Sequence, residues 1–359
     1  MMTRRTVHAA AIAALATQAL PTHAKAASGW HMPDEGDPHV RTWMAFAGSA
    51  SIWRELLPHV QRDLARVANA IARFEPVHML VNPVDAARAR KLVDPRVTLV
   101  ECALDDLWVR DTGCVFVKNA AGERAGVDFN FNGWGDKQSH DRDAAVAGFM
   151  TERADVDHLR SRLVLEGGGI EVDGHGNAII TESCVLNSNR NPGLGKAAVE
   201  TTLKETLGLQ KIIWLPGIVG QDITDGHTDF YARFVRPGVV VAALDNDPQS
   251  FDYAVTRRHL DILRQSSDAA GRPLEVVTLE VPKRPRNSHR SRDFAAGYIN
   301  FYLCNGAVIA PEFGDRAADD AAHGTLARLF PGRQVVPVAI DAIAAGGGGI
   351  HCATQQEPR

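Results

Sequence analysis

The sequence has no Cys-x-x-Cys pair, and five cysteines are scattered irregularly along its 359 residues. Zinc sites and thioredoxin-like redox centres need cysteines at short, regular spacing, so the sequence disfavours both. An odd number of cysteines leaves at least one thiol unpaired even in an oxidising compartment. The five are Cys102, Cys114, Cys184, Cys304 and Cys352.

A strong excess of charge is also lacking, because the formal net charge is only −4. This small value argues against a nucleic-acid partner, which would need a broad basic surface. Beyond the N-terminal stretch there is no run of about 18 apolar residues, so we expect no stable membrane anchor. A composition of 45% hydrophobic and 23% charged residues is typical of a globular protein with a large core.

The N-terminal stretch has the features of an export signal. Arg4 and Arg5 precede an uncharged, alanine-rich segment from Val7 to Leu20, and small residues flank a cleavage point after Ala26. Adjacent arginines before a weakly apolar segment indicate the twin-arginine route. We therefore expect residues 1–26 to be a signal peptide and the protein to be periplasmic or secreted. An alanine-rich amphipathic helix is the alternative, although the segment lacks acidic residues and a proline follows it.

The rest of the chain alternates apolar, strand-like runs with helical stretches, which predicts an α/β protein. No Pro/Ser-rich linker or shift in composition marks a boundary, so we expect a single domain over residues 28–359. The expected strands cover residues 43–46, 77–81, 97–102, 114–117, 178–186, 212–216, 230–235 and 239–244, and the expected helices cover residues 53–74, 85–92 and 195–207.

Three consecutive glycines precede a strand-like start at two places, Gly167–Gly169 and Gly347–Gly349. The likeness indicates a repeated unit, with a chance match among 31 glycines as the alternative. Cys352 follows the second run. Because glycines let a backbone approach a ligand and present amide hydrogens, this thiol could attack a carbon held there. A small buried cysteine that ends a strand explains the same residues equally well.

His227 and Asp229 form the second candidate element, within the segment DGHTD. Residues two apart in a strand share a face, so both side chains would project into one site. The carboxylate could hold a cation while the imidazole transfers a proton. The alternatives are a structural histidine or a pair of metal ligands, although no third and fourth ligand follow at an informative spacing. His351 would point away from Cys352 in a strand, which disfavours it as the general base.

Two further carboxylates lie next to glycine turns. Asp111 follows Trp108 in the segment WVRDTG, where the carboxylate could point into a cleft and the indole could flank a planar cation. A loop ion pair between Arg110 and Asp111 is the simpler alternative. Glu166 precedes Gly167 in the segment LEGGG, and an ordinary turn with a solvated glutamate explains this segment as well.

Taken in order, the motifs WVRDTG, FNFNGWG, LEGGGI, NRNP, DGHTD and GGGGIHCATQQ resemble those of the agmatine deiminase and bacterial-type peptidylarginine deiminase family. The resemblance extends from Met32 to Pro358. It implies a five-bladed, pseudosymmetric α/β propeller of the pentein type. It also implies hydrolysis of a guanidino group, either in agmatine, giving N-carbamoylputrescine, or in peptidyl arginine, giving citrulline. Neither a metal nor an organic cofactor is implied.

The same resemblance assigns roles to the candidate residues. Cys352 is the nucleophile that forms a covalent thiouronium, and His227 is the general acid and base. Glu166 orients His227 or the substrate. The expected catalytic residues are Cys352, His227, Asp229, Asp111 and Glu166, and the expected substrate-binding residues are Trp108, Asp111, Asp229 and Gly349.

Departures from the family pattern concern the substrate. Cys114 follows RDTG where the cytoplasmic agmatine deiminases carry proline, and Phe230 follows GHTD where they carry asparagine. Residues 49–54 read SASIWR in place of a DNWR-like segment that could meet the distal end of agmatine. Agmatine, free arginine and peptidyl arginine therefore stay open, as does a homo-oligomeric assembly. The alternative functions are amidinotransfer to an amine and capture of guanidino ligands by a non-catalytic exported protein.

Overall fold

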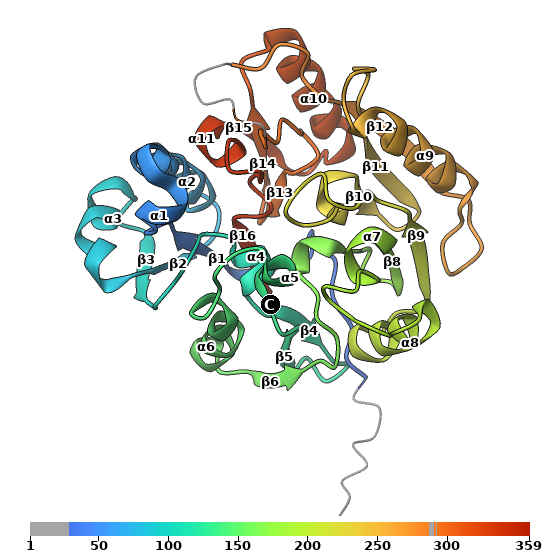
Figure 1. The fold of residues 1–359 in the computed structure, drawn as a ribbon, viewed down its shortest axis with the longest axis horizontal. Coiled ribbons are helices and arrows are strands. Elements are labelled where there is room, and N and C mark those ends of the chain that lie inside the picture. Colours follow the sequence, from blue (N-terminus) through green and yellow to red (C-terminus); the bar gives the residue numbers. More distant parts are fainter. Residues whose placement is uncertain (1–28, 287–290, 292) are drawn as a thin grey trace, which may run out of the picture.

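The computed structural model describes residues 29–286, 291 and 293–359. The predicted export signal over residues 1–26 lies outside the described residues. Within the described part, no helix combines the length and the apolar character that crossing a lipid bilayer requires. The chain winds once around a centre, from the blue N-terminal sheet through green and yellow to the red C-terminal segment (Figure 1).

The described residues form sixteen strands in five sheets, so the predicted α/β class is confirmed. In each sheet a first strand runs antiparallel to a second, which runs parallel to a third. A helix joins the two parallel strands, because parallel neighbours need a crossover connection. The sheets are β16 (Thr354–Pro358), β1 (His39–Phe46), β2 (Val77–Val81) and β3 (Val97–Glu101); β4 (Val115–Lys118), β5 (Arg124–Asp128) and β6 (Asp157–Arg160); β7 (Ile170–Val172), β8 (Asn177–Thr181) and β9 (Lys211–Leu215); β10 (Ala232–Arg236), β11 (Val239–Leu244) and β12 (Glu275–Glu280); and β13 (Tyr302–Cys304), β14 (Ala307–Glu312) and β15 (Gln334–Ala339).

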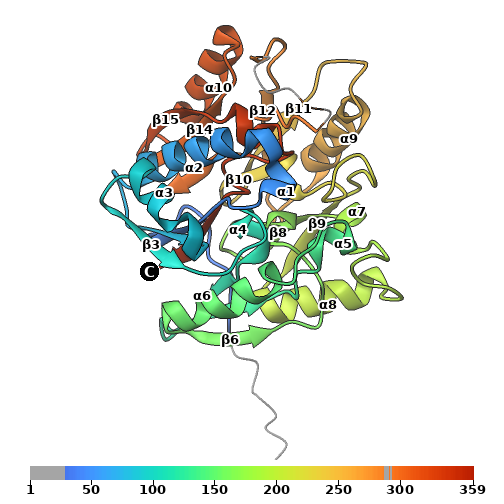
Figure 2. The same ribbon diagram turned by 60° about the vertical axis from the view of Figure 1, so that its left-hand side comes forward.

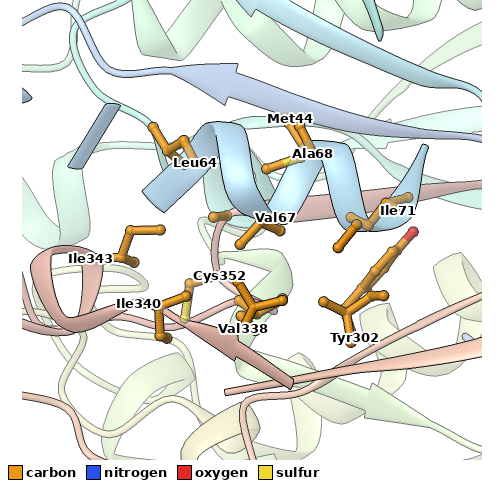
Figure 3. Packing of buried hydrophobic residues seen from close by; sticks show 14 of the residues in the cluster. Met44, Leu64, Val67, Ala68, Ile71, Tyr302, Val338, Ile340, Ile343 and Cys352 are labelled. Atoms are coloured by element: carbon orange, nitrogen blue, oxygen red, sulfur yellow. The ribbon is translucent and has the colours of Figure 1, made fainter. Parts of the chain in front are cut away.

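The longer helices lie outside the sheets, whereas the short α4 lies near the middle (Figures 1 and 2). Helix α2 packs Leu64 and Val67 against Val338 and Ile343 in the largest hydrophobic core, and Cys352 lies in the same core (Figure 3). The helices are α1 (Ala50–Trp53), α2 (Leu57–Ile71), α3 (Ala86–Leu92), α4 (Val109–Thr112), α5 (Gly133–Asp136), α6 (Val146–Ala154), α7 (Glu182–Val185), α8 (Lys196–Leu207), α9 (Asp252–Gln265), α10 (Arg316–Leu329) and α11 (Asp341–Ala344).

The first sheet combines both ends of the described chain. β16 pairs antiparallel with β1, with Trp43 opposite Gln355. The indole of Trp43 also donates a hydrogen bond to Glu357 at 2.9 Å. Since Cys352 comes just before β16, this pairing anchors the proposed nucleophile against the N-terminal sheet.

Two predicted elements are interrupted. The strand expected over residues 178–186 ends at Thr181, where the chain turns into α7 and brings Cys184 back towards the centre of the molecule. The helix expected over residues 53–74 is divided, because α2 starts only at Leu57. A proline in the first turn of α2 is compatible with a helix start but not with a continuous helix interior.

Candidate active site

The candidate residues lie on the segments that lead into the first strands of the sheets. Asp111 precedes β4, Glu166 precedes β7, His227 and Asp229 precede β10, and Cys352 precedes β16. These five residues are buried, and none is more than 6% exposed. The structure therefore brings together, at the centre of the molecule, side chains that are far apart in the sequence.

The thiol of Cys352 lies between a carboxylate and a carboxamide. Its sulfur is 3.4 Å from Asp229 Oδ2 and 3.3 Å from Asn300 Nδ2. Burial, followed by the charges of Asp229 and Asp111, raises the pKa of the thiol well above its ordinary value. Cys352 is therefore held as a neutral thiol until a cation enters the site.

His351 contacts Asp229. The prediction that its side chain points away from Cys352 was based on a strand, and that strand is wrong. Residues 350–353 form turns instead of a strand, so alternation along a strand does not apply. His351 Nδ1 lies 2.8 Å from Asp229 Oδ2, and Nε2 lies 2.8 Å from Glu35 Oε2. Burial alone would raise the pKa of Asp229, but the hydrogen bond and charge of His351 bring it below its ordinary value. Asp229 thus stays ionised.

His227 and Asp229 reach the centre through a turn, and the predicted strand is wrong there. His227 is the residue before η5 (Thr228–Phe230), a 3-10 turn. Its Nε2 lies 3.1 Å from Glu166 Oε2, and its Nδ1 lies 3.7 Å from Asp111 Oδ1. Burial opposes protonation, but Asp111 and Glu166 raise the pKa of His227 well above its ordinary value. The ring is therefore held as an imidazolium.

Glu166 accepts hydrogen bonds from several donors at once. Arg190 Nε donates to Oε1 at 2.9 Å, while His227 Nε2 and the Cys184 thiol approach Oε2 at 3.1 and 3.4 Å. Burial would raise the pKa of Glu166, but His227 and Arg190 bring it below its ordinary value. The carboxylate is therefore ionised, and it holds His227 through Nε2, which leaves Nδ1 as the nitrogen that is not bound to Glu166.

Asp111 does not form the loop ion pair with Arg110, because Arg110 pairs instead with Glu35 at 3.0 Å. Asp111 Oδ2 accepts a hydrogen bond from Trp134 Nε1, and Oδ1 accepts one from Gly168 N, both at 3.0 Å. Burial raises the pKa of Asp111 to about 6, although His227 acts in the opposite direction. Near neutral pH the carboxylate is charged but poorly solvated.

Glycine at position 168 keeps the centre open. A Cβ atom there would lie 2.6 Å from His227 Nδ1, 2.8 Å from Asp111 Oδ1 and 3.3 Å from Asp229 Oδ2. No side chain can approach three polar groups so closely without displacing them. The first triple glycine therefore serves the geometry of the site as well as the turn before β7.

A cavity of about 240 Å³ opens at this centre. Cys352 and Asp111 line it, and so does Trp108, as expected for a residue that borders the pocket. The glycines in its wall are residues 346–348, whereas Gly349 packs against Asn300. Of the two residues expected to bind substrate besides the carboxylates, Trp108 faces the cavity and Gly349 lies behind it.

A larger cavity of about 990 Å³ adjoins the first. Both cavities are bordered by Ile223, Phe230 and Asp293. The larger one is rich in carboxylates, which are contributed by Asp222, Asp245, Asp247, Asp252 and Asp293. The small cavity thus opens towards a wide, acidic hollow.

One cluster could in principle hold a metal ion. Ligand atoms of Glu166, Cys184 and His227 lie within 4.8 Å of one another, a grouping that the irregular cysteine spacing did not indicate. The guanidinium of Arg190, however, already forms an ion pair with Glu166 at 2.9 Å. A divalent cation would have to bind beside this fixed positive charge, so these residues fit a metal poorly.

Several residues of the centre received no role from the sequence. Trp134 and Arg190 lie in the motifs FNFNGWG and NRNP, which were used only to establish the resemblance. Glu35 and Asn300 lie in the segments MPDEGDPHVRTWMAF and YINFYLCNGAVIAPEFGD, which resemble the family's opening segment and its late strand and loop, but neither residue was given a role. Asn300 could have been found by asking which polar residue leads into the late strand that the resemblance indicates in the segment from Tyr298.

Comparisons with known proteins extend over most of the chain. A family model described as Porphyromonas-type peptidyl-arginine deiminase matches residues 31–358. The agmatine deiminases of Stutzerimonas stutzeri and Pseudomonas fluorescens are 41% and 40% identical over 353 and 356 residues, which cover 92% of this chain and 96% of each relative. A solved structure of the agmatine deiminase of Enterococcus faecalis has a TM-score of 0.88 at 34% identity and covers 92% of this chain and 96% of its own.

Proposed function

Because the chain belongs to the Porphyromonas-type peptidyl-arginine deiminase family, we propose that it hydrolyses the guanidino group of agmatine to ammonia and N-carbamoylputrescine. The protein is then a hydrolase that acts on a C–N bond. Its relatives in Pseudomonas fluorescens and Stutzerimonas stutzeri are named agmatine deiminases. The observation that carries the proposal is the buried thiol of Cys352, which lies 3.4 Å from a carboxylate whose other oxygen has no partner.

Two carboxylates are placed to hold the guanidinium. Among the described residues, Asp229 Oδ1 has no hydrogen-bond partner. Asp111, which precedes the first strand of another sheet, lines the cavity that Cys352 also lines. A guanidinium is planar and offers donors on its nitrogens, so paired carboxylates can fix it and leave the carbon exposed. Its positive charge also offsets the carboxylates that oppose ionisation of Cys352.

In the first step, sulfur forms a bond to the guanidinium carbon and a C–N bond breaks. The thiol proton is lost to solvent as the cation binds, and the His227 imidazolium donates its Nδ1 proton to the departing nitrogen, which leaves as ammonia. The enzyme retains a cationic thiouronium on Cys352 and a neutral His227. His227 suits this task because Nε2 is held by Glu166, while Nδ1 has no hydrogen-bond partner among the described residues.

In the second step, water replaces sulfur on the same carbon. His227 takes a proton from the water, a C–O bond forms, the C–S bond breaks, and the thiol and one further proton are regenerated with the ureido product. The two steps together consume one guanidinium and one water and release one ureido compound and one ammonium. Only side chains of this chain take part, and no cofactor is assigned.

Peptidyl arginine is the second candidate substrate. A cavity of about 990 Å³ next to the catalytic one has room for more than the short chain of agmatine. Its acidic lining, which includes Asp245 and Asp247, would favour a basic peptide. The family description names peptidyl arginine as well.

Product analysis on a panel of agmatine, free arginine and arginyl peptides tests the proposal. Cys352→Ala is expected to lower kcat by at least about 10⁴-fold, with little change in the unfolding temperature. Ammonia release that persists in this variant would exclude Cys352 as the nucleophile. A transferred amidino group would identify an amidinotransferase, and binding without ammonia would identify a capture protein.

Three further expectations stand as proposals beside the activity. The five sheets around the centre support a five-bladed, pseudosymmetric α/β propeller of the pentein type. One hydrophobic core includes residues of both the first and the last sheet, and β16 pairs with β1. Both observations support a single catalytic domain over residues 28–359. Export through residues 1–26 rests on the sequence alone, and cell fractionation of the natural host with and without Arg4→Lys and Arg5→Lys tests it.

A further inference from the structure

Asn300 occupies, in the fifth sheet, the place that the proposed catalytic residues occupy in the other four. It lies two residues before β13 (Tyr302–Cys304), as Cys352 lies two residues before β16. The side chain is 1% exposed. Every sheet thus sends one polar segment to the centre, and Asn300 belongs to the one segment for which no role has been assigned.

The carboxamide of Asn300 is fixed by backbone contacts on both sides. Oδ1 accepts a hydrogen bond from Cys352 N, and Nδ2 donates one to the carbonyl of Asp229, both at 3.3 Å. His351 N also donates to the Asn300 carbonyl at 3.2 Å. Because a backbone donor faces Oδ1 and a backbone acceptor faces Nδ2, the two ends of the amide cannot be exchanged.

Both ends of this fixed amide lie against the reacting sulfur. Cys352 Sγ is 3.3 Å from Asn300 Nδ2 and 3.4 Å from Oδ1. The oxygen can accept from the neutral thiol, and the NH₂ group can donate to the thiolate. Gly349 makes this approach possible, since a Cβ atom at that position would overlap Asn300 Oδ1.

Most charges around the sulfur oppose its ionisation. Burial and the carboxylates of Asp229 and Asp111 favour the thiol, whereas the Asn300 side chain and the Gly349 amide favour the thiolate. A hydrogen bond to a buried anion is roughly twice as strong as one between neutral groups. The Asn300 side chain, which favours the reactive form, is therefore in direct contact with the sulfur.

We propose that Asn300 is a further catalytic residue, whose amide accepts from the Cys352 thiol before reaction and donates to the thiolate during attack. The inference rests on the proposed role of Cys352 as the nucleophile. No atom is transferred to or from Asn300. It differs from Asp229 and Asp111, which hold the cation, because it acts on the sulfur itself.

The test measures the reactivity of the thiol directly, without turnover. Iodoacetamide alkylation of Cys352 is followed by peptide mass spectrometry at pH 8, below the midpoint of ionisation, where the rate is proportional to the thiolate fraction. Loss of a hydrogen bond to a charged group corresponds to about one to two pH units. Asn300→Asp is therefore expected to slow alkylation by about 10- to 100-fold.

In Asn300→Asp, the aspartate side chain has nearly the volume of asparagine and keeps an acceptor for Cys352 N. The substitution therefore removes the NH₂ donor and adds a negative charge without creating a cavity. Asn300→Ala removes the donor without adding charge and provides a second variant if the aspartate does not fold. Both are expected to lower kcat in proportion to the alkylation rate. The partly exposed Cys102 of the same protein is the internal reference, and its rate is expected to stay constant.

Asn305→Ala is the matched control variant. Asn305 lies just after β13 and binds the backbone of His39 through both ends of its amide at 3.0 Å, away from the sulfur. It is expected to leave Cys352 alkylation within twofold of wild type. Wild-type alkylation in folded Asn300→Asp, or in Asn300→Ala, would overturn the assignment to Asn300. Turnover by Cys352→Ala would instead overturn the proposed function, so the two failures are distinguishable.

Discussion

Two buried polar clusters at the middle of the molecule differ in how completely their atoms are paired. The hub, defined here as Glu35, Arg110, Arg233 and His351, has a carboxylate with four donors. Glu35 accepts from Arg110 Nη2, Arg233 Nη2 and Leu303 N at 3.0, 2.7 and 2.9 Å, and His351 Nε2 lies at 2.8 Å. These partners come from different sheets, so the hub holds the sheets together.

The candidate active site leaves equivalent atoms unpaired. His227 Nδ1 and Asp229 Oδ1 are buried without a hydrogen-bond partner among the described residues. Buried polar groups are nearly always satisfied in proteins, so each exception needs an explanation. For these two atoms, the proposed guanidinium substrate and the proton transfer would supply it. His351 connects the two clusters through Asp229 and Glu35.

The pKa values of the carboxyls follow the same division. Burial would raise the pKa of Glu35, but Arg233, His351 and Arg110 bring it well below its ordinary value. Asp111, which has fewer compensating charges, has its pKa raised to about 6 by burial. Pairing therefore stabilises the hub, whereas incomplete pairing in the candidate active site is a cost of folding that binding of the proposed substrate would offset.

Glu35→Ala is expected to have the largest effect on stability. It leaves Arg110 and Arg233 buried without their shared counter-ion, so the free energy of unfolding is expected to fall by about 3–5 kcal/mol. Denaturant unfolding measures this loss. Glu205→Ala is the control, because its carboxylate pairs with Arg162 at 3.8 Å on the surface, and a change within about 0.5 kcal/mol is expected. Equal stability of the two variants would contradict the proposed role of the hub.

Much of the candidate active site could be predicted from short motifs, because most of its candidate residues lie within a few residues of a glycine turn. Cys352, Asp111 and Glu166 were found in this way. His227 and Asp229 were found although the predicted strand was wrong, since His227, just before the short turn, and Asp229, within it, still face the centre. Glu35 and Asn300 were missed because their roles depend on contacts between sheets that are distant in sequence.

Gly168→Ala is expected to reverse the pattern of Glu35→Ala, with a large effect on activity and a small one on unfolding. The added Cβ would lie within 3.3 Å of His227, Asp111 and Asp229, and displacing such groups is expected to lower kcat/KM by about 100-fold. Gly169→Ala is the control. Its Cβ would meet Leu165 at 3.3 Å but His227 only at 3.8 Å. Equal activities of the two variants would show that the centre adapts to the added group.

Acidification of the unmodified protein is expected to affect the candidate active site but not the hub. Of the three predictions in this comparison, it has the smallest expected effect. As pH falls through about 6, Asp111 takes up a proton and loses its attraction for the guanidinium, so kcat/KM is expected to fall tenfold per pH unit below that value. Glu35, with its lowered pKa, keeps its charge at pH 5, so the hub stays paired.

Asp63, whose pKa is also raised to about 6 but which lies on α2, provides the control. Asp63→Asn is expected to leave the acidic limb unchanged. An acidic limb that moves with Asp63, or that coincides with loss of the folded state, would assign the pH dependence to stability instead of to substrate binding.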